Sequence, residues 1–90
     1  MVQVVWTRRA LSDLATIRTY IGQFSPLAAQ RMAVRLKRAG DSLAEHPDRG
    51  RMAGAGLREL TTIPPYILRY QAGADIVTIL RIRHAARQDG

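Results

Sequence analysis

The spacing of apolar residues changes its period once along this 90-residue chain, and this change constrains the fold more than any other feature. Up to about residue 46, large apolar residues recur every three or four positions, which is typical of helices that bury one face. From residue 57 onward the apolar residues form short runs bounded by Pro and Gly, which is typical of strands. A strand, two helices and then several strands predict an α+β fold.

Two helices are expected, joined by a very short turn. The first is predicted over Arg8 to Phe24, after a strand in residues 2–6 and with Thr7 as its cap. Ser25 and Pro26 indicate an immediate second start, because serine caps free amides and proline at the first helical position loses no hydrogen bond. The second helix is stopped by Pro47. So short a joint predicts an antiparallel helical hairpin. The stripes expected to face the core are Ala10, Leu14, Ile17, Ile21 and Phe24 in the first helix, and Ala29, Met32, Leu36, Ala39 and Leu43 in the second.

Three strands are expected in the second half of the chain. They are predicted over Leu57 to Ile63, Tyr66 to Gln71 and Ile76 to Arg83, and residues 48–56 are predicted to form a loop. Short connections between the strands predict a three-stranded antiparallel meander, with the last and most apolar strand inside the sheet. The expected order is β-α-α-β-β-β in a single domain that spans residues 1–90. One sheet face would pack on the hairpin, and the other would be free to meet a partner.

The net charge of +7 is large for this length, and thirteen of the fourteen basic residues are arginine. A guanidinium binds carboxylates and phosphates with paired hydrogen bonds, so an acidic partner is implied, either nucleic acid or a carboxylate-rich protein. A GC-rich genome would explain the preference for arginine over lysine but not the net charge. With no cysteine and only two histidines, we expect no disulfide, no metal site and no cofactor. Neither a leader segment nor a long apolar span is apparent, so we expect a cytoplasmic protein without a membrane partner.

The candidate functional residues gather at the end of the last predicted strand. We expect its more apolar set to face the core, which is Ile76, Thr78, Leu80 and Ile82. Arg81 and Arg83 would then project from the open face, where Arg58 of a neighbouring strand would join them as a third guanidinium. His84 follows directly and has a side chain suited to general acid or base chemistry, although a surface or capping histidine is the plainer interpretation.

Other polar residues of the strands have more ordinary interpretations. Glu59 lies next to Arg58 and should therefore point to the opposite face, where we expect it to form a salt bridge. Tyr66, Leu68 and Tyr70 share one face and are expected in the core. The sequence contains no Ser-His-Asp arrangement, phosphate-binding glycine loop or paired catalytic carboxylates, which argues against a free-standing metabolic enzyme.

The chain resembles the RelE/ParE superfamily of toxins over nearly its whole length. The matching stretches, in order, are Trp6-Thr7 with Ala10, Asp13-Leu14, Ile17, Tyr20-Ile21, Ser25-Pro26, Ala28-Ala29, Leu43 to Pro47, Gly50-Arg51, Leu57 to Leu60, Tyr66 to Tyr70, and Ile79 to His84 with Arg87. Each stretch alone is a weak signal, but their order and spacing are specific. The resemblance implies a toxin of a type II toxin-antitoxin (plasmid stabilisation) system. It also implies a hetero-oligomer with a cognate acidic antitoxin, either ParD-like or RelB-like.

The resemblance leaves two activities open. Members similar to RelE are ribosome-dependent mRNA endoribonucleases, and members similar to ParE inhibit DNA gyrase by binding. No lysine lies in the predicted strands and no tyrosine follows Tyr70, which favours the gyrase inhibitor, a protein without catalytic residues. A ribonuclease would instead use Arg58, Arg81 and His84. On the favoured hypothesis the residues that bind the target or partner are Arg58, Arg81, Arg83, His84 and Arg87. A plain nucleic-acid-binding module is a third hypothesis.

Overall fold

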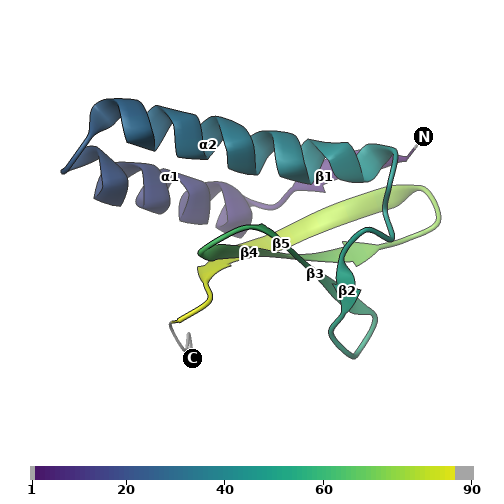
Figure 1. The fold of residues 1–90 in the computed structure, drawn as a ribbon. Helices are drawn as coiled ribbons and strands as arrows, with labels where there is room; N and C mark the ends of the chain where they lie inside the picture. Colours follow the sequence, from purple (N-terminus) through teal and green to yellow (C-terminus); the bar gives the residue numbers. More distant parts are fainter. Residues whose placement is uncertain (1, 87–90) are drawn as a thin grey trace.

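A helical hairpin lies over one face of a five-stranded sheet in the computed structural model of the protein, which describes residues 2–86 (Figure 1). The elements in chain order are β1 (Gln3–Trp6), α1 (Arg8–Gly22), α2 (Pro26–Asp41), the short 3-10 helix η1 (Ser42–Ala44), β2 (Arg51–Met52), β3 (Leu57–Ile63), β4 (Tyr66–Ala72) and β5 (Ile76–His84). The predicted α+β order is therefore confirmed. None of the helices in the described part of the chain has the length and apolar character needed to cross a membrane.

The sheet has the strand order β1-β5-β4-β3-β2. β3, β4 and β5 are antiparallel neighbours, which confirms the predicted meander. β1 pairs in parallel with the first half of β5, from Gln3 opposite Ile76 to Trp6 opposite Ile79, so β5 lies inside the sheet there as expected. β2 pairs with β3 and falls within residues 48–56, which the sequence predicted to be only a loop.

Side-chain caps begin both helices where the sequence predicted them. The Thr7 hydroxyl accepts a hydrogen bond from the Ala10 amide at 3.1 Å, and the Ser25 hydroxyl accepts one from the Ala28 amide at 3.1 Å. α1 ends at Gly22, two residues before its predicted end, and the Phe24 side chain is 75% exposed. The prediction that Phe24 continues the buried stripe is therefore wrong, because the chain has already left the helix at that point.

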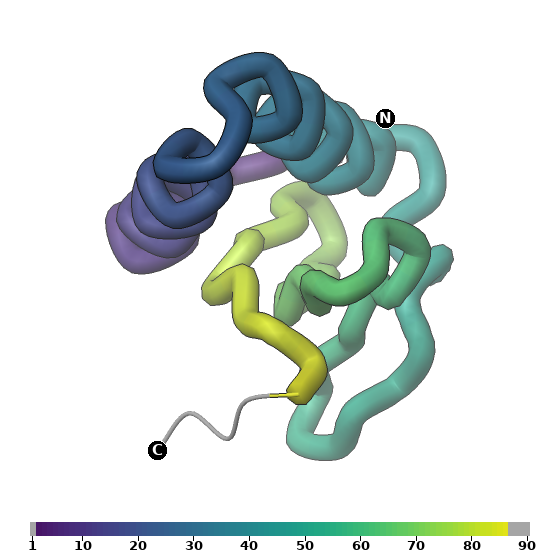
Figure 2. Tube along the Cα trace, turned by 60° about the vertical axis from the view of Figure 1, so that its left-hand side comes forward, coloured from purple at the N-terminus to yellow at the C-terminus, as the bar shows by residue number. Residues whose placement is uncertain are grey.

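The core lies between the hairpin and the sheet. Figure 2 shows the hairpin on one side of the sheet, with the opposite side left open in the described part of the chain. The second predicted stripe supplies the fully buried Leu36 and Leu43. Tyr66, Leu68 and Tyr70 of β4 are buried against them, as predicted. We call the sheet surface that faces away from the hairpin the open face.

β5 contains a bulge that the sequence did not reveal. Tyr70 of β4 lies opposite Ile79 and Arg69 lies opposite Arg81, so Leu80 is an extra residue in β5. The core residues are Val77 and Ile79 before the bulge and Ile82 after it. The prediction that Ile76, Thr78 and Leu80 face the core is therefore wrong, and Ile76 is 43% exposed. The prediction is confirmed for Ile82. Arg81 and Arg83 flank Ile82 in the strand and therefore point away from the core.

Candidate functional site

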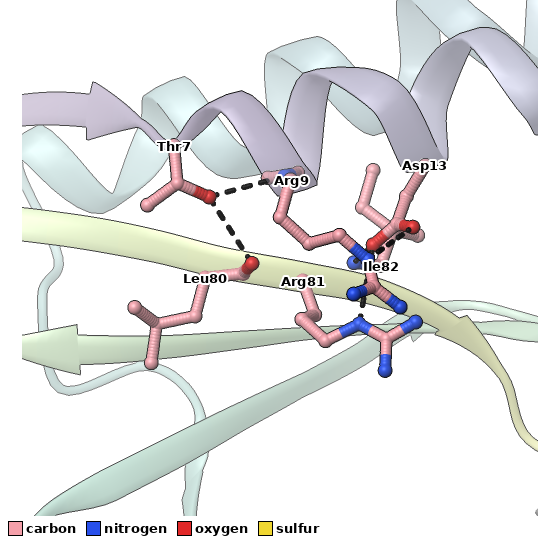
Figure 3. Close-up of polar contacts among 7 residues, drawn as sticks. Thr7, Arg9, Asp13, Leu80, Arg81 and Ile82 are labelled. Atoms are coloured by element: carbon pink, nitrogen blue, oxygen red, sulfur yellow. Dashed lines mark hydrogen bonds and ion pairs between the residues drawn. The ribbon is translucent and has the colours of Figure 1, made fainter. Parts of the chain in front are cut away.

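The second half of β5 is bordered by α1 instead of a strand. β1 stops pairing at Ile79, while β5 continues to His84. Two side chains from the start of α1 take over the hydrogen bonding, as Figure 3 shows. The Thr7 hydroxyl donates to the Leu80 carbonyl at 3.1 Å, and the Asp13 carboxylate accepts the Ile82 amide at 3.0 Å. These contacts fix the backbone on both sides of Arg81.

Asp13 also receives two arginine side chains. Its carboxylate lies 3.4 Å from Nε of Arg81 and 3.4 Å from Nε of Arg9. Both distances are at the long limit for hydrogen bonds, and the Arg9 side chain is 61% exposed, so this second pair contributes little. The bond from the Ile82 amide is therefore the main contact of Asp13. Its carboxylate holds Arg81 at the margin of the open face beside α1.

Three of the five predicted binding residues line one groove. Arg81, Arg83 and His84 border a groove of about 430 Å³ between α1 and the end of β5, together with Tyr20 and Tyr66. The His84 ring stands edge-on to Tyr66 with ring centroids 5.6 Å apart. Nδ1 of His84 accepts a hydrogen bond from the Ala86 amide at 3.1 Å. That contact agrees with the plainer interpretation of His84 as a capping residue after the strand.

Arg58 does not join this group. It lies opposite Tyr70 in the sheet and therefore has the parity of the core residues. Its Nη1 donates to the Gly50 carbonyl at 2.7 Å and to the Asp48 carbonyl at 3.2 Å. The expectation of a third guanidinium beside Arg81 and Arg83 is therefore wrong, because strand parity turns Arg58 toward the loop before β2. Arg87, the remaining predicted residue, lies outside the described residues.

A cluster of arginines surrounds Glu59 on the open face, and we call Arg51, Arg69 and Arg83 the open-face arginine cluster. Nη2 of each arginine donates to the Glu59 carboxylate, at 3.0 Å from Arg51, 2.9 Å from Arg69 and 3.4 Å from Arg83. Glu59 is 5% exposed. Burial raises the pKa of Glu59, but the hydrogen bonds from Arg69, Arg51 and Arg83 together lower it further, so the net pKa lies below the ordinary value. The salt bridge expected for Glu59 is confirmed, but it forms on the open face with Arg83, whereas the predicted direction of Arg58 placed Glu59 on the opposite face.

Asp13, Arg51 and Arg69 were not predicted to be members of these polar groups. A signal existed for Arg69, because it alternates with Leu68 and Tyr70 and must therefore point away from a core that contains them. Arg51 lay in a stretch without periodicity, which carried no signal. Asp13 belonged to the family resemblance, but nothing in its position indicated that it would reach the backbone of β5.

Comparison with known proteins identifies the family. The model of the family described as "ParE toxin of type II toxin-antitoxin system, parDE" matches residues 4–89. Toxin RelE2 of Caulobacter vibrioides is 69% identical over 97% of this chain and 99% of that protein. The putative toxin Y4kP of Sinorhizobium fredii is 41% identical over 96% of this chain and 91% of that protein. A solved chain of the chromosomal ParDE toxin-antitoxin system from P. aeruginosa superposes with a TM-score of 0.82 at 26% identity, covering 93% of this chain and 96% of that one. The chain therefore belongs to the ParE toxin family of type II toxin-antitoxin systems.

Proposed function

We propose that this toxin arrests growth by binding and inhibiting DNA gyrase, and that a cognate antitoxin neutralises it. The observation that carries a binding mechanism over cleavage of RNA is the separation of Arg58 from Arg81 and His84. Those three residues are the set that a ribonuclease mechanism would use here.

Cleavage of a phosphodiester by general acid-base chemistry needs its acid, its base and its cation within reach of one phosphate. Arg58 instead donates to two backbone carbonyls next to β2, on the side of the sheet that carries the hairpin. His84 uses Nδ1 to accept the Ala86 amide. Arg81 and Arg83 remain at the groove, where they suit the binding of an anionic surface.

Messenger RNA cleavage at the ribosome is the second candidate, and the name of a close relative, Toxin RelE2, is the observation in its favour. The parDE description of the matching family and the ParDE structure favour gyrase, because members similar to ParE act on that enzyme.

The outer surface of the hairpin suits the antitoxin. A groove of about 460 Å³ between α1 and α2 is lined by Leu14 and Val34 and bordered by Arg18, Lys37 and Arg38. An apolar groove with a basic rim fits an amphipathic, acidic helix, a common mode of peptide recognition. The antitoxin is therefore proposed to dock here and to extend toward the sheet edge, forming a hetero-oligomer with the toxin.

Two parallel assays test the target. Purified toxin is added to a gyrase supercoiling reaction and, separately, to a translating ribosome with a reporter message. We expect inhibited supercoiling and intact message. Changing Arg81 and Arg83 together to alanine should weaken inhibition at least about tenfold, which corresponds to about 1.4 kcal/mol. The matched control removes two exposed arginines of α2, Arg31 and Arg35, and should leave inhibition unchanged. Cleaved message with normal supercoiling would overturn the proposal.

A further inference from the structure

The open-face arginine cluster places three cations above one buried anion. Arg51, Arg69 and Arg83 come from β2, β4 and β5, and Glu59 of β3 lies beneath them. The Arg51 side chain is 64% exposed and that of Arg69 is 36% exposed, whereas that of Glu59 is only 6% exposed. Three positive charges against one negative charge leave the group net positive. A ligand would contact the exposed arginines and not the buried Glu59.

Glu59 holds these side chains in place before any ligand arrives. Its Oε2 accepts Nη2 of Arg83 and both Nε and Nη2 of Arg69, and its Oε1 accepts Nη2 of Arg51. A guanidinium has five N–H donors, so each arginine keeps donors beyond those that Glu59 uses. Side chains that are already ordered lose less conformational entropy when a ligand binds.

The sheet register arranges part of this group as a row. Arg51 lies opposite Glu59, Glu59 opposite Arg69, and Arg69 opposite Arg81. Since neighbouring strands lie about 4.8 Å apart, the row separates the backbones of Arg51 and Arg69 by roughly 10 Å. Their guanidinium groups converge on the two oxygens of the Glu59 carboxylate, and Arg81 continues the row beyond Arg69. Several ordered guanidiniums in a row across the strands match a chain of negative groups better than one small anion.

The chemistry of the two faces decides which kind of polymer fits. Exposed large apolar side chains concentrate on the hairpin, where Leu11, Tyr20, Leu27 and Val34 lie. Protein partners bind mainly through apolar and aromatic anchors, with charged residues depleted at the centre of the interface. Nucleic-acid interfaces are more polar and much more positively charged. The hairpin therefore suits a protein, and the open-face arginine cluster suits a nucleic-acid backbone.

We propose that the open-face arginine cluster binds the phosphodiester backbone of double-stranded DNA, with Glu59 as the positioning residue beneath it. Contacts of this kind fix the orientation of a protein on a duplex without reading its sequence. The choice of DNA over RNA rests on the proposed function, because gyrase holds a DNA duplex. Arg51, Arg69 and Glu59 thereby extend the binding surface beyond the groove at the end of β5.

Binding of the purified toxin to a fluorescently labelled DNA duplex, without gyrase, tests the proposal. Anisotropy titrations over about 50 to 200 mM salt give the log-log slope, to which three neutralised phosphates contribute roughly −2.7. Arg51→Ala and Arg69→Ala should each make the slope less negative by about 0.9. Arg35→Ala removes the same charge from α2 and should leave the slope unchanged. Equal slopes for Arg51→Ala, Arg69→Ala and the parent would overturn the proposal.

Glu59→Gln separates positioning from simple attraction. The substitution makes the protein more positive, so attraction alone would raise its affinity for DNA. If Glu59 positions the guanidiniums, affinity should instead fall several-fold in a variant whose circular dichroism matches the parent. Affinity equal to or above that of the parent would overturn the positioning role, and the exposed Arg51→Ala variant still tests the DNA site if Glu59→Gln does not fold.

The same variants in the supercoiling assay keep this inference distinct from the proposed function. Inhibition of gyrase by Arg51→Ala and Arg69→Ala at the parent's potency, with unchanged DNA slopes, would reject the DNA site and keep the gyrase target. If DNA binding depends on these arginines but the parent toxin does not inhibit supercoiling, the DNA site is supported and gyrase is rejected as the target. Tighter binding of an RNA duplex or of a polyglutamate peptide through the same arginines would overturn the choice of DNA.

Discussion

Replacing Asp13 should loosen the second half of β5 from α1. Asp13→Ala removes the acceptor of the Ile82 amide and the partner of the Arg81 and Arg9 side chains. A backbone amide left without an acceptor in a part-buried place costs about 1 to 3 kcal/mol. The two arginine contacts are long, and that of Arg9 is exposed, so they add little. We therefore expect a loss of about 2 kcal/mol in the free energy of unfolding.

Urea unfolding followed by circular dichroism measures this loss. With a slope of about 1.3 kcal/mol per molar urea for a chain of this size, the midpoint should fall by about 1.5 M. Asp13→Asn keeps one oxygen that can accept the Ile82 amide, so its midpoint should fall by about half as much. Arg9→Ala is the control, and its effect should stay below about 0.5 kcal/mol. An Asp13→Ala midpoint within about 0.3 M of the parent, or a larger effect from Arg9→Ala, would refute the reasoning.

Three further predictions concern the core and the open face. The folded pKa of Glu59 lies below its ordinary value near 4.5, so its stabilising contribution is present above that pH and is lost as the pH falls through the folded pKa. Urea midpoints measured at falling pH should show a shallower decline in Glu59→Gln than in the parent. Tyr70→Phe leaves the Gly50 amide and the Pro47 carbonyl without their shared partner, and urea unfolding should register a loss of about 2 kcal/mol. Gly40→Ala should lower the melting temperature despite the better helix propensity of alanine, because the added Cβ would overlap the indole ring of Trp6, which packs against α2 at this position.

The periodicity of the apolar residues predicted most of the fold, because each helix and strand buries one of its faces. The helix starts followed from Thr7 and Ser25, whose hydroxyls cap the free amides. The three strands of the meander were predicted to within about a residue of their observed ends. β2 escaped prediction because two exposed residues carry no pattern, and its pairing depends on β3.

The bulge explains why the core face of β5 was assigned incorrectly. Both alternating sets of the strand are apolar before Arg81, so the sequence alone could not decide which set faces the helices. The extra residue at Leu80 then exchanges the two faces, and Ile82 takes the side that Ile79 occupies before it. Arg81 and Arg83 were placed correctly because only the second half of the strand determines their direction. The Glu59 group was beyond prediction in detail because its members come from four strands whose register the sequence does not state.

The parallel pairing of β1 with β5 has a consequence for synthesis of the toxin. Among the described strands, β1 leaves the ribosome first and β5 last, yet β5 is the strand with which β1 pairs. A nascent chain that ends before residue 76 lacks Val77, Ile79 and Ile82 of the core as well as Arg81, Arg83 and His84 of the groove. Contacts between such distant segments form late and slowly. An interrupted translation product is therefore an unfinished fold that lacks part of the core and the groove at the end of β5, and its exposed apolar residues make it a substrate for proteolysis.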